Sequence, residues 1–165
     1  FEPDEKIYNI LQFNIKSFNL KKIKLINKGL WNENTKLSFK SEGADGGLIS
    51  DVNNQTLSDC VVEVLSLKPF LNKKVDFLKL DIEGAETTVL KDIRSELNLV
   101  DRIFVEYHSF IAQEQTLNEI IDILTKAKFR LHISSPGLTS KSPFVNISTY
   151  NNMDMQLNIY GYKED

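Results

Sequence analysis

One stretch of this chain predicts its fold: Val75-Asp76-Phe77-Leu78-Lys79-Leu80-Asp81-Ile82-Glu83-Gly84-Ala85-Glu86. Residues 77–80 form a short apolar run with the length and bulk of a buried strand, and the run stops at Asp81, a residue type that strands disfavour. Apolar residues then recur at four-residue spacing, at Ala85, Val89, Ile93 and Leu97. This spacing predicts a helix that packs one face on a sheet. The unit is therefore a strand, an acidic turn and a helix.

Acidic residues follow the predicted strand directly. Ligands of an open α/β sheet bind outside the carboxyl ends of its strands, so Asp81 and Glu83 lie where a site is expected. A single acid here is also explained as a cap that favours the positive end of the helix. Three acids within six residues, framing Gly84, exceed what a cap requires. We therefore predict catalytic roles for Asp81 and Glu83.

The composition is that of an ordinary soluble domain. The 165 residues are 41% hydrophobic and 26% charged, which is enough to bury a core. The net charge of -3 argues against a nucleic-acid binder that acts through bulk electrostatics. Cys60 is the only cysteine, so an internal disulfide is excluded and a reducing, cytoplasmic location is expected. No run of residues reaches the length of a membrane span.

The first residues, Phe1-Glu2-Pro3-Asp4, are typical of a strand end followed by a helix. Asp4 is the predicted N-cap, because apolar residues recur at near-helical spacing after it. At the tip of such a strand, Glu2 can accept both hydroxyls of a ribose, as an acid does in nucleotide-binding α/β folds. The alternative is that Glu2 only lies near the positive end of the helix dipole.

Residues 23–30 alternate in polarity and predict a strand. Asn27 lies where the chain leaves this strand, and Trp31 is expected to be a packing residue of the core or of a lid rather than a stacking platform. Residues 41–59 are polar and glycine-rich without a sustained period, which predicts a long loop at the rim of the site. Further strands are predicted at 37–39 and 61–67.

A second buried strand is predicted at residues 103–105, ending in Glu106-Tyr107-His108. Neighbouring parallel strands lie about 4.8 Å apart, so pairing with residues 77–80 brings His108 and Asp81 to one rim. A lone histidine at a strand end is commonly structural. Because imidazole titrates near working pH, we give His108 even odds of being a catalytic general base rather than a structural residue. Asp81 is the alternative base.

The remaining residues predict a helix and two strands. Thr116-Leu117-Asn118-Glu119 has the pattern of a capping box, and an amphipathic pattern follows it up to Lys128. Strands are predicted at 130–134 and 157–162. His132 lies inside the first of these strands and is expected to be structural.

The segment Leu78-Lys79-Leu80-Asp81-Ile82-Glu83-Gly84-Ala85-Glu86 closely resembles the signature of the FkbM family of S-adenosylmethionine-dependent methyltransferases, in which a strand runs into Asp-x-Glu-Gly-x-Glu. Phe1-Glu2-Pro3-Asp4 is similar to the family's Glu-Pro segment, and Val105-Glu106-Tyr107-His108 to its Glu-x-His strand end. The resemblance covers roughly residues 1–110. It implies an α/β fold with a Rossmann-like class I methyltransferase sheet, mostly parallel, that closes in a C-terminal antiparallel hairpin.

The same resemblance implies S-adenosylmethionine as cofactor and O-methylation of a sugar, glycolipid, polyketide or similar hydroxyl compound. It favours the ribose role for Glu2, and we predict that Glu2, Asn27 and Asp81 bind the cofactor. Methyl transfer is an in-line displacement, so the protein mainly aligns donor and acceptor and controls a proton. No metal is predicted, although Asp81, Glu83 and His108 are also a donor set for a divalent ion.

One part of such a fold has no counterpart in these residues. The glycine-rich turn that cradles the methionine part of the cofactor follows the first strand, and neither is recognisable here. We therefore expect residues 1–165 to form a single partial methyltransferase domain that is inactive alone. Two alternatives stay open: a non-catalytic Rossmann-like module that binds a partner or carbohydrate, and another nucleotide-dependent Rossmann enzyme such as an oxidoreductase.

Overall fold

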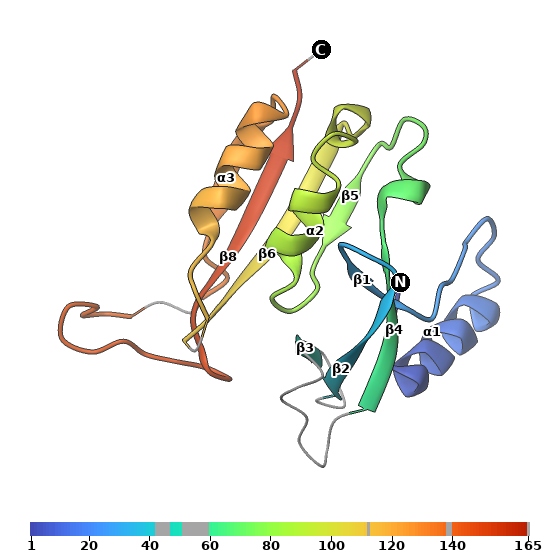
Figure 1. The fold of residues 1–165 in the computed structure, drawn as a ribbon, viewed down its shortest axis with the longest axis horizontal. Coiled ribbons are helices and arrows are strands. Elements are labelled where there is room, and N and C mark those ends of the chain that lie inside the picture. Colours follow the sequence, from blue (N-terminus) through green and yellow to red (C-terminus); the bar gives the residue numbers. More distant parts are fainter. Residues whose placement is uncertain (42–46, 51–59, 112, 138–139, 165) are drawn as a thin grey trace. The chain divides into compact units, whose positions relative to one another are not determined.

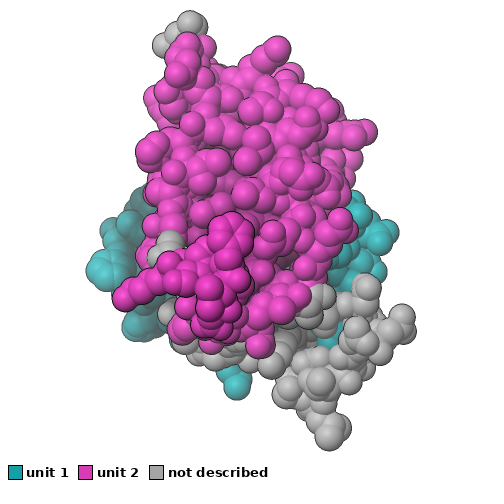
Figure 2. Space-filling view, turned by 90° about the vertical axis from the view of Figure 1, so that its left-hand side faces the viewer, with its two compact units in different colours: residues 1–66 teal, residues 67–165 magenta. Residues whose placement is uncertain are grey.

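The computed structural model describes residues 1–41, 47–50, 60–111, 113–137 and 140–164. The chain divides into two compact units, residues 1–66 and residues 67–165 (Figure 2). The expectation of one domain over residues 1–165 stays a prediction.

The first unit contains one helix and one mixed sheet. Its elements are α1 (Glu5–Ser17), β1 (Gly29–Trp31), β2 (Thr35–Ser41), β3 (Gly47–Ser50) and β4 (Cys60–Ser66). The strand order is β1-β4-β2-β3, with β1 parallel to β4 and the other two pairs antiparallel. Trp31 packs against a small cluster of buried residues, which confirms its predicted packing role. The cluster consists of Leu37, Val62 and Val64.

Two predictions for the first unit are wrong in part. Only the end of the strand expected at residues 23–30 forms. The backbone pairs with β4 at Gly29–Trp31 and not before. Alternating polarity without a partner strand does not make a strand. Within the loop expected at 41–59, Gly47–Ser50 pairs with β2, while 42–46 and 51–59 lie outside the described residues.

The second unit carries the central motif. Its elements are η2 (Lys68–Phe70), β5 (Leu78–Leu80), α2 (Glu86–Asp92), η3 (Leu97–Leu99), β6 (Arg102–Phe110), α3 (Leu117–Lys126), β7 (Arg130–Ser134) and β8 (Met153–Tyr162). The strand order is β5-β6-β8-β7, and α2 and α3 lie against one face of this sheet (Figure 1). The parallel pairing of β5 with β6 and the antiparallel pairing of β7 with β8 confirm the predicted neighbours.

The sheets are mixed rather than mostly parallel. Among the described strands, β1 with β4 and β5 with β6 are parallel, and the other four pairs are antiparallel. The long β8 accounts for two of the antiparallel pairs, because it lies between β6 and β7. The expectation of a mostly parallel sheet is therefore not confirmed.

The core of the second unit lies between its sheet and its helices. The four positions predicted for the apolar helix face are each at most 2% exposed, although α2 itself ends at Asp92. On β6, Ile103, Val105 and Tyr107 are buried, and they alternate with the half-buried Phe104 and Glu106. This period of two places Glu106 and His108 on the opposite face of the sheet from the buried apolar residues.

The helix predicted after residue 116 is confirmed, but the prediction of a capping box at its start is wrong. Thr116 occupies the N-cap position of α3 without a side-chain cap hydrogen bond. Its hydroxyl instead shares a hydrogen bond of 2.6 Å with the hydroxyl of Thr87, and Glu119 pairs with Lys91. Across the described part of the chain, no helix combines the length and apolar character that a membrane span needs.

Candidate functional site

The site is built on the turn between β5 and α2. Glu83 has a φ of 52° and Gly84 a φ of 97°, so both lie in the left-handed region. This region suits glycine and is uncommon for glutamate. Neither Asp81 nor Glu83 caps the helix, because the N-cap of α2 is Ala85 and no side chain bonds there. The capping explanation for these two acids therefore has no support in the structure.

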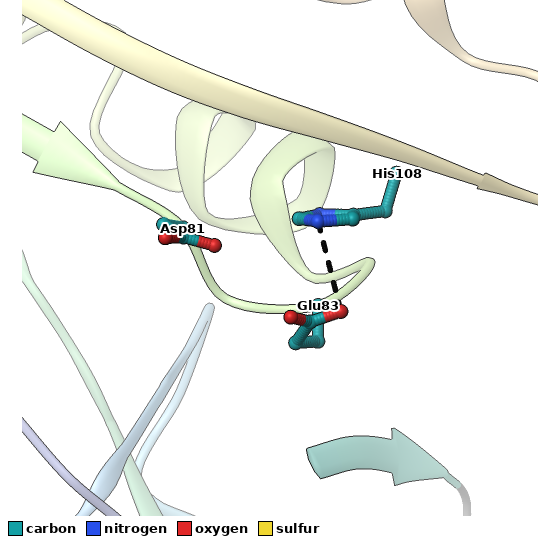
Figure 3. A group of neighbouring side chains, drawn as sticks. All are labelled: Asp81, Glu83 and His108. Carbon is teal, nitrogen blue, oxygen red and sulfur yellow. Dashed lines mark ion pairs between the residues drawn. The ribbon is translucent and has the colours of Figure 1, made fainter. Parts of the chain in front are cut away.

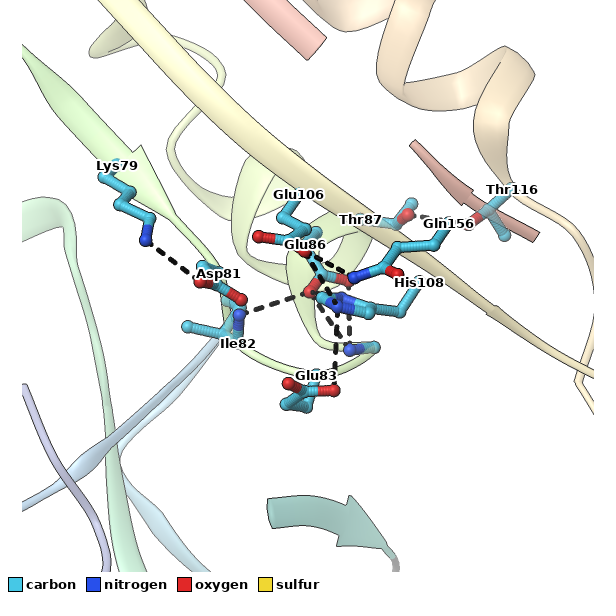
Figure 4. A network of polar contacts seen from close by, with 11 residues as sticks. Lys79, Asp81, Ile82, Glu83, Glu86, Thr87, Glu106, His108, Thr116 and Gln156 are labelled. Carbon is cyan, nitrogen blue, oxygen red and sulfur yellow. Dashed lines mark hydrogen bonds and ion pairs between the residues drawn. The ribbon is translucent and has the colours of Figure 1, made fainter. Parts of the chain in front are cut away.

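A third acid, Glu86, holds the turn in place. Its side chain is 1% exposed. The Ile82 N–H donates to Glu86 Oε1 at 3.2 Å, and the Gly84 N–H donates to Oε1 at 3.1 Å and to Oε2 at 3.0 Å (Figure 4). The amide groups on both sides of Glu83 are thus bound by one buried carboxylate.

His108 reaches this carboxylate from β6. The imidazole is 2% exposed, and its Nδ1 lies 3.0 Å from Glu86 Oε1. Its Nε2 lies 3.6 Å from Glu83 Oε2 (Figure 3) and 3.9 Å from Glu106 Oε1. Because a carboxylate accepts hydrogen bonds, Nδ1 carries the hydrogen toward Glu86. In the neutral ring, Nε2 is then the unprotonated nitrogen and faces Glu83.

Asp81 completes a group of three. Its Oδ2 forms an ion pair with Lys79 Nζ at 3.0 Å, and the residue is exposed. One donor atom each of Asp81, Glu83 and His108 lies within 4.8 Å of the others. The structure therefore brings together the three residues predicted for catalysis. Carboxylates and imidazole also suit a divalent cation, so these are the residues that could hold one.

The electrostatics of the site are set by several acids around one imidazole. Burial opposes the charged form of His108, but the hydrogen bond and charge of Glu86, with the charges of Glu83 and Glu106, raise its pKa above the ordinary value. Burial also raises the pKa of Glu83, where the charge of His108 opposes the shift and the charges of Asp81, Glu86 and Glu106 add to it. A proton is therefore held more tightly here than in water.

Three residues of this network were not predicted as site residues: Glu86, Glu106 and Gln156. Gln156 lies opposite His108 in the β6–β8 register, and its Nε2 donates a hydrogen bond to Glu106 Oε1. Glu86 was visible as the last acid of the motif. Gln156 has no such signal, because its position depends on the register of β8. The prediction that β6 ends at Glu106 to His108 is wrong, since the strand continues to Phe110.

The other predicted cofactor residues lie together in the first unit. Glu2 Oε1 accepts a hydrogen bond from the Asp4 N–H at 2.8 Å, and Asn27 Nδ2 donates to the Glu2 carbonyl oxygen at 2.8 Å. Burial is the main cause that raises the pKa of Glu2, and the Asp4 N–H opposes it. His132 is exposed on β7 with its ring 6.0 Å from that of Tyr160, away from the Asp81, Glu83 and His108 group of its unit.

Comparison with known proteins places the chain in a family. It resembles the crystal structure of methyltransferase FkbM from Methylobacillus flagellatus KT, with 14% identity and a TM-score of 0.58 over 98% of this chain and 35% of that chain. At this identity the likeness shows the fold alone. No curated protein matches the chain. The model of the methyltransferase FkbM domain matches residues 1–131, and the chain therefore belongs to the FkbM methyltransferase family.

Proposed function

We propose that this chain functions as a domain of an S-adenosylmethionine-dependent O-methyltransferase. The proposed acceptor is a hydroxyl of a sugar, glycolipid or other small natural product. Membership of the family supports methyl transfer. The observation that carries the choice of oxygen as acceptor is the hydrogen bond between Glu86 and His108 Nδ1. This bond leaves Nε2 of the neutral ring as a proton acceptor, which is what an attacking hydroxyl needs.

In the proposed reaction, His108 Nε2 takes the proton of the acceptor hydroxyl. S-adenosylmethionine would supply the methyl group to the hydroxyl oxygen, and the sulfonium sulfur would keep the electron pair of the broken bond, giving S-adenosylhomocysteine. The proton stays on His108, where Glu83 and Glu106 face the resulting imidazolium. A base whose pKa is raised toward working pH suits this transfer. Asp81 fits the role less well, because its carboxylate is exposed and paired with Lys79.

We propose that Glu2 and Asn27 of the first unit bind the cofactor, while a cofactor role for Asp81 stays a prediction. Glu2 uses one oxygen for the Asp4 N–H, and a carboxylate offers roughly four lone-pair positions. It therefore keeps the capacity to accept hydrogen bonds from ribose hydroxyls. The bond from Asn27 to the Glu2 backbone holds both residues in one corner of the first unit. We propose that this corner binds the nucleoside part of S-adenosylmethionine.

The two histidines of the chain provide a matched test. Methyl-labelled S-adenosylmethionine is offered with a panel of monosaccharides, glycolipids and polyketide alcohols to the full-length protein, its His108→Gln variant and its His132→Gln variant. We expect His108→Gln to lower kcat about 10²- to 10⁴-fold, the usual contribution of a general base. His132→Gln is expected to leave kcat unchanged.

Equal turnover by the wild-type protein and the His108→Gln variant would exclude His108 as the base. Absence of methyl transfer to every acceptor class would count against the enzyme proposal as a whole. The same assay, run on residues 1–165 alone, tests the expectation that they are inactive in isolation.

A further inference from the structure

We propose that Glu86 is a positioning residue that sets both the tautomer of His108 and the backbone of the turn that carries Asp81 and Glu83. The catalytic meaning of this inference rests on the proposed function. Its structural content, which is the position of one proton and the shape of one turn, does not.

The contacts of Glu86 join three separate parts of the second unit. Glu86 is the first residue of α2, its N–H donors Ile82 and Gly84 belong to the turn, and His108 belongs to β6 (Figure 4). A buried polar group needs partners within the protein. The Glu86 carboxylate finds its partners in the turn and in β6, which carry the proposed catalytic groups. A change at Glu86 therefore acts on both of them together.

The tautomer of His108 follows from the acceptors that Glu86 presents. Both of its oxygens accept a backbone N–H, since Oε1 is bound by Ile82 and Gly84 and Oε2 by Gly84. A carboxylate in this arrangement offers only acceptors to the ring. The hydrogen of neutral His108 therefore lies on Nδ1. Nε2, which faces Glu83, keeps its lone pair.

The turn is held by the same group. Glu83 has a φ of 52°, a conformation that persists in a non-glycine residue only where its surroundings hold it. The two N–H groups that flank Glu83 in the chain both donate to Glu86. Glu86 therefore holds the backbone on both sides of Glu83 and keeps Glu83 Oε2 beside His108 Nε2.

A Glu86→Leu variant tests the inference by removing the acceptor. Leucine offers no acceptor to His108 Nδ1, while the carboxylates of Glu83 and Glu106 still face Nε2. We expect the ring hydrogen to move to Nε2. The readout is the pattern of proton and nitrogen correlations of the two imidazole rings in the ¹⁵N-labelled chain, recorded at a pH where His108 is neutral. His132 is the internal control, and Glu96→Leu, which changes an acid outside the network, is the matched variant.

The inference predicts Nδ1–H for His108 in the wild-type chain, Nε2–H in Glu86→Leu, and no change in Glu96→Leu or at His132. In the active protein, the kcat of Glu86→Leu should fall about 10²-fold or more.

An unchanged His108 tautomer in Glu86→Leu would overturn the inference. If that variant does not fold, the wild-type spectrum decides, because Nε2–H on neutral His108 contradicts the assigned role of Glu86. Neither result depends on methyl transfer. A correct tautomer in a protein without methyltransferase activity would refute the proposed function and leave the positioning role of Glu86 intact.

Discussion

Two acidic turns of this protein precede helices and behave differently. Before α1, Asp4 Oδ1 accepts the N–H groups of Lys6 and Ile7 at 2.8 and 3.2 Å, so the acid caps its own helix. Before α2, no side chain caps the helix, and Glu86 instead binds the preceding turn and His108, which is 22 residues away in the chain. One turn completes a helix, and the other assembles a site.

Burial explains the difference. None of the residues of α1 is buried, whereas four of the seven residues of α2 are. An acid at the surface is satisfied by nearby amides and water, and its effect ends there. A buried acid must find protein donors, and in doing so it orders the elements that supply them. The same kind of turn therefore contributes to stability in one place and to proposed chemistry in the other.

The largest expected effect comes from removing the buried acid. Glu86→Ala leaves the Ile82 and Gly84 N–H groups and His108 Nδ1 without their partner. Breaking a buried pair of this kind costs about 3–5 kcal/mol of the free energy of unfolding. Denaturant unfolding of the variant beside Glu96→Ala measures the loss. Equal losses in the two variants would show that Glu86 does not organise the turn.

The corresponding change in the first unit should be smaller and local. Asp4→Ala removes the cap of α1 and is expected to cost about 1 kcal/mol of helix stability. Amide hydrogen exchange should become faster at Lys6 and Ile7 and stay unchanged around His108. Asn9→Ala, on the same helix, is the control and should not accelerate exchange. A change in the imidazole signals of His108 would contradict the local character of this cap.

Glu83→Gln tests the crowding of charge at the site. The pKa of Glu83 is raised in the folded protein, so folding favours its protonated form. This contribution is present below the ordinary glutamate pKa and is lost as the pH rises through the folded pKa. At neutral pH the neutral glutamine should therefore stabilise the fold, by up to about 1 kcal/mol, and the gain should vanish in acid.

Glu63 is the control with the opposite sign. Its pKa is lowered by the hydrogen bond and charge of Lys28, so its favourable contribution is present above the ordinary glutamate pKa and is lost in acid. Glu63→Gln should bring no gain at neutral pH. Thermal unfolding of both variants across the acid and neutral range measures the two trends. A loss of stability at neutral pH in Glu83→Gln would contradict the account of the site.

The smallest effect is expected from a chelator. If His108 Nε2 is the base, EDTA should leave the methyl transfer rate unchanged, and added Mg²⁺ or Mn²⁺ should not raise it. Loss of turnover with EDTA and its recovery with Mg²⁺ would assign Asp81, Glu83 and His108 to a divalent cation instead. The measurement distinguishes these two uses of one group of side chains.

Much of the second unit follows from local patterns in the sequence. The apolar run, the acidic turn and the four-residue spacing predicted β5 and α2, and the neighbouring apolar strand predicted the approach of His108 to Asp81. These features depend on short-range periodicity and on the geometry of parallel strands.

The remaining features depend on partners that are distant in the chain. The strand expected at residues 23–30 lacks a partner for most of its length, and the capping box fails because the Thr116 hydroxyl bonds Thr87 instead. The position of Gln156 requires the register of β8. The role of Glu86 requires knowledge of its burial, since an exposed glutamate at the same place would only favour the helix end.

The most direct test of the proposed function is a calorimetric titration of S-adenosylhomocysteine into the full-length protein and its variants. The account predicts binding to the wild-type protein, affinity weakened about 10- to 100-fold by Glu2→Ala through the loss of charge-assisted hydrogen bonds, and near-wild-type affinity in His108→Gln. No binding to the wild-type protein would contradict the account and favour a non-catalytic module. Unchanged affinity in Glu2→Ala would remove Glu2 from the cofactor site.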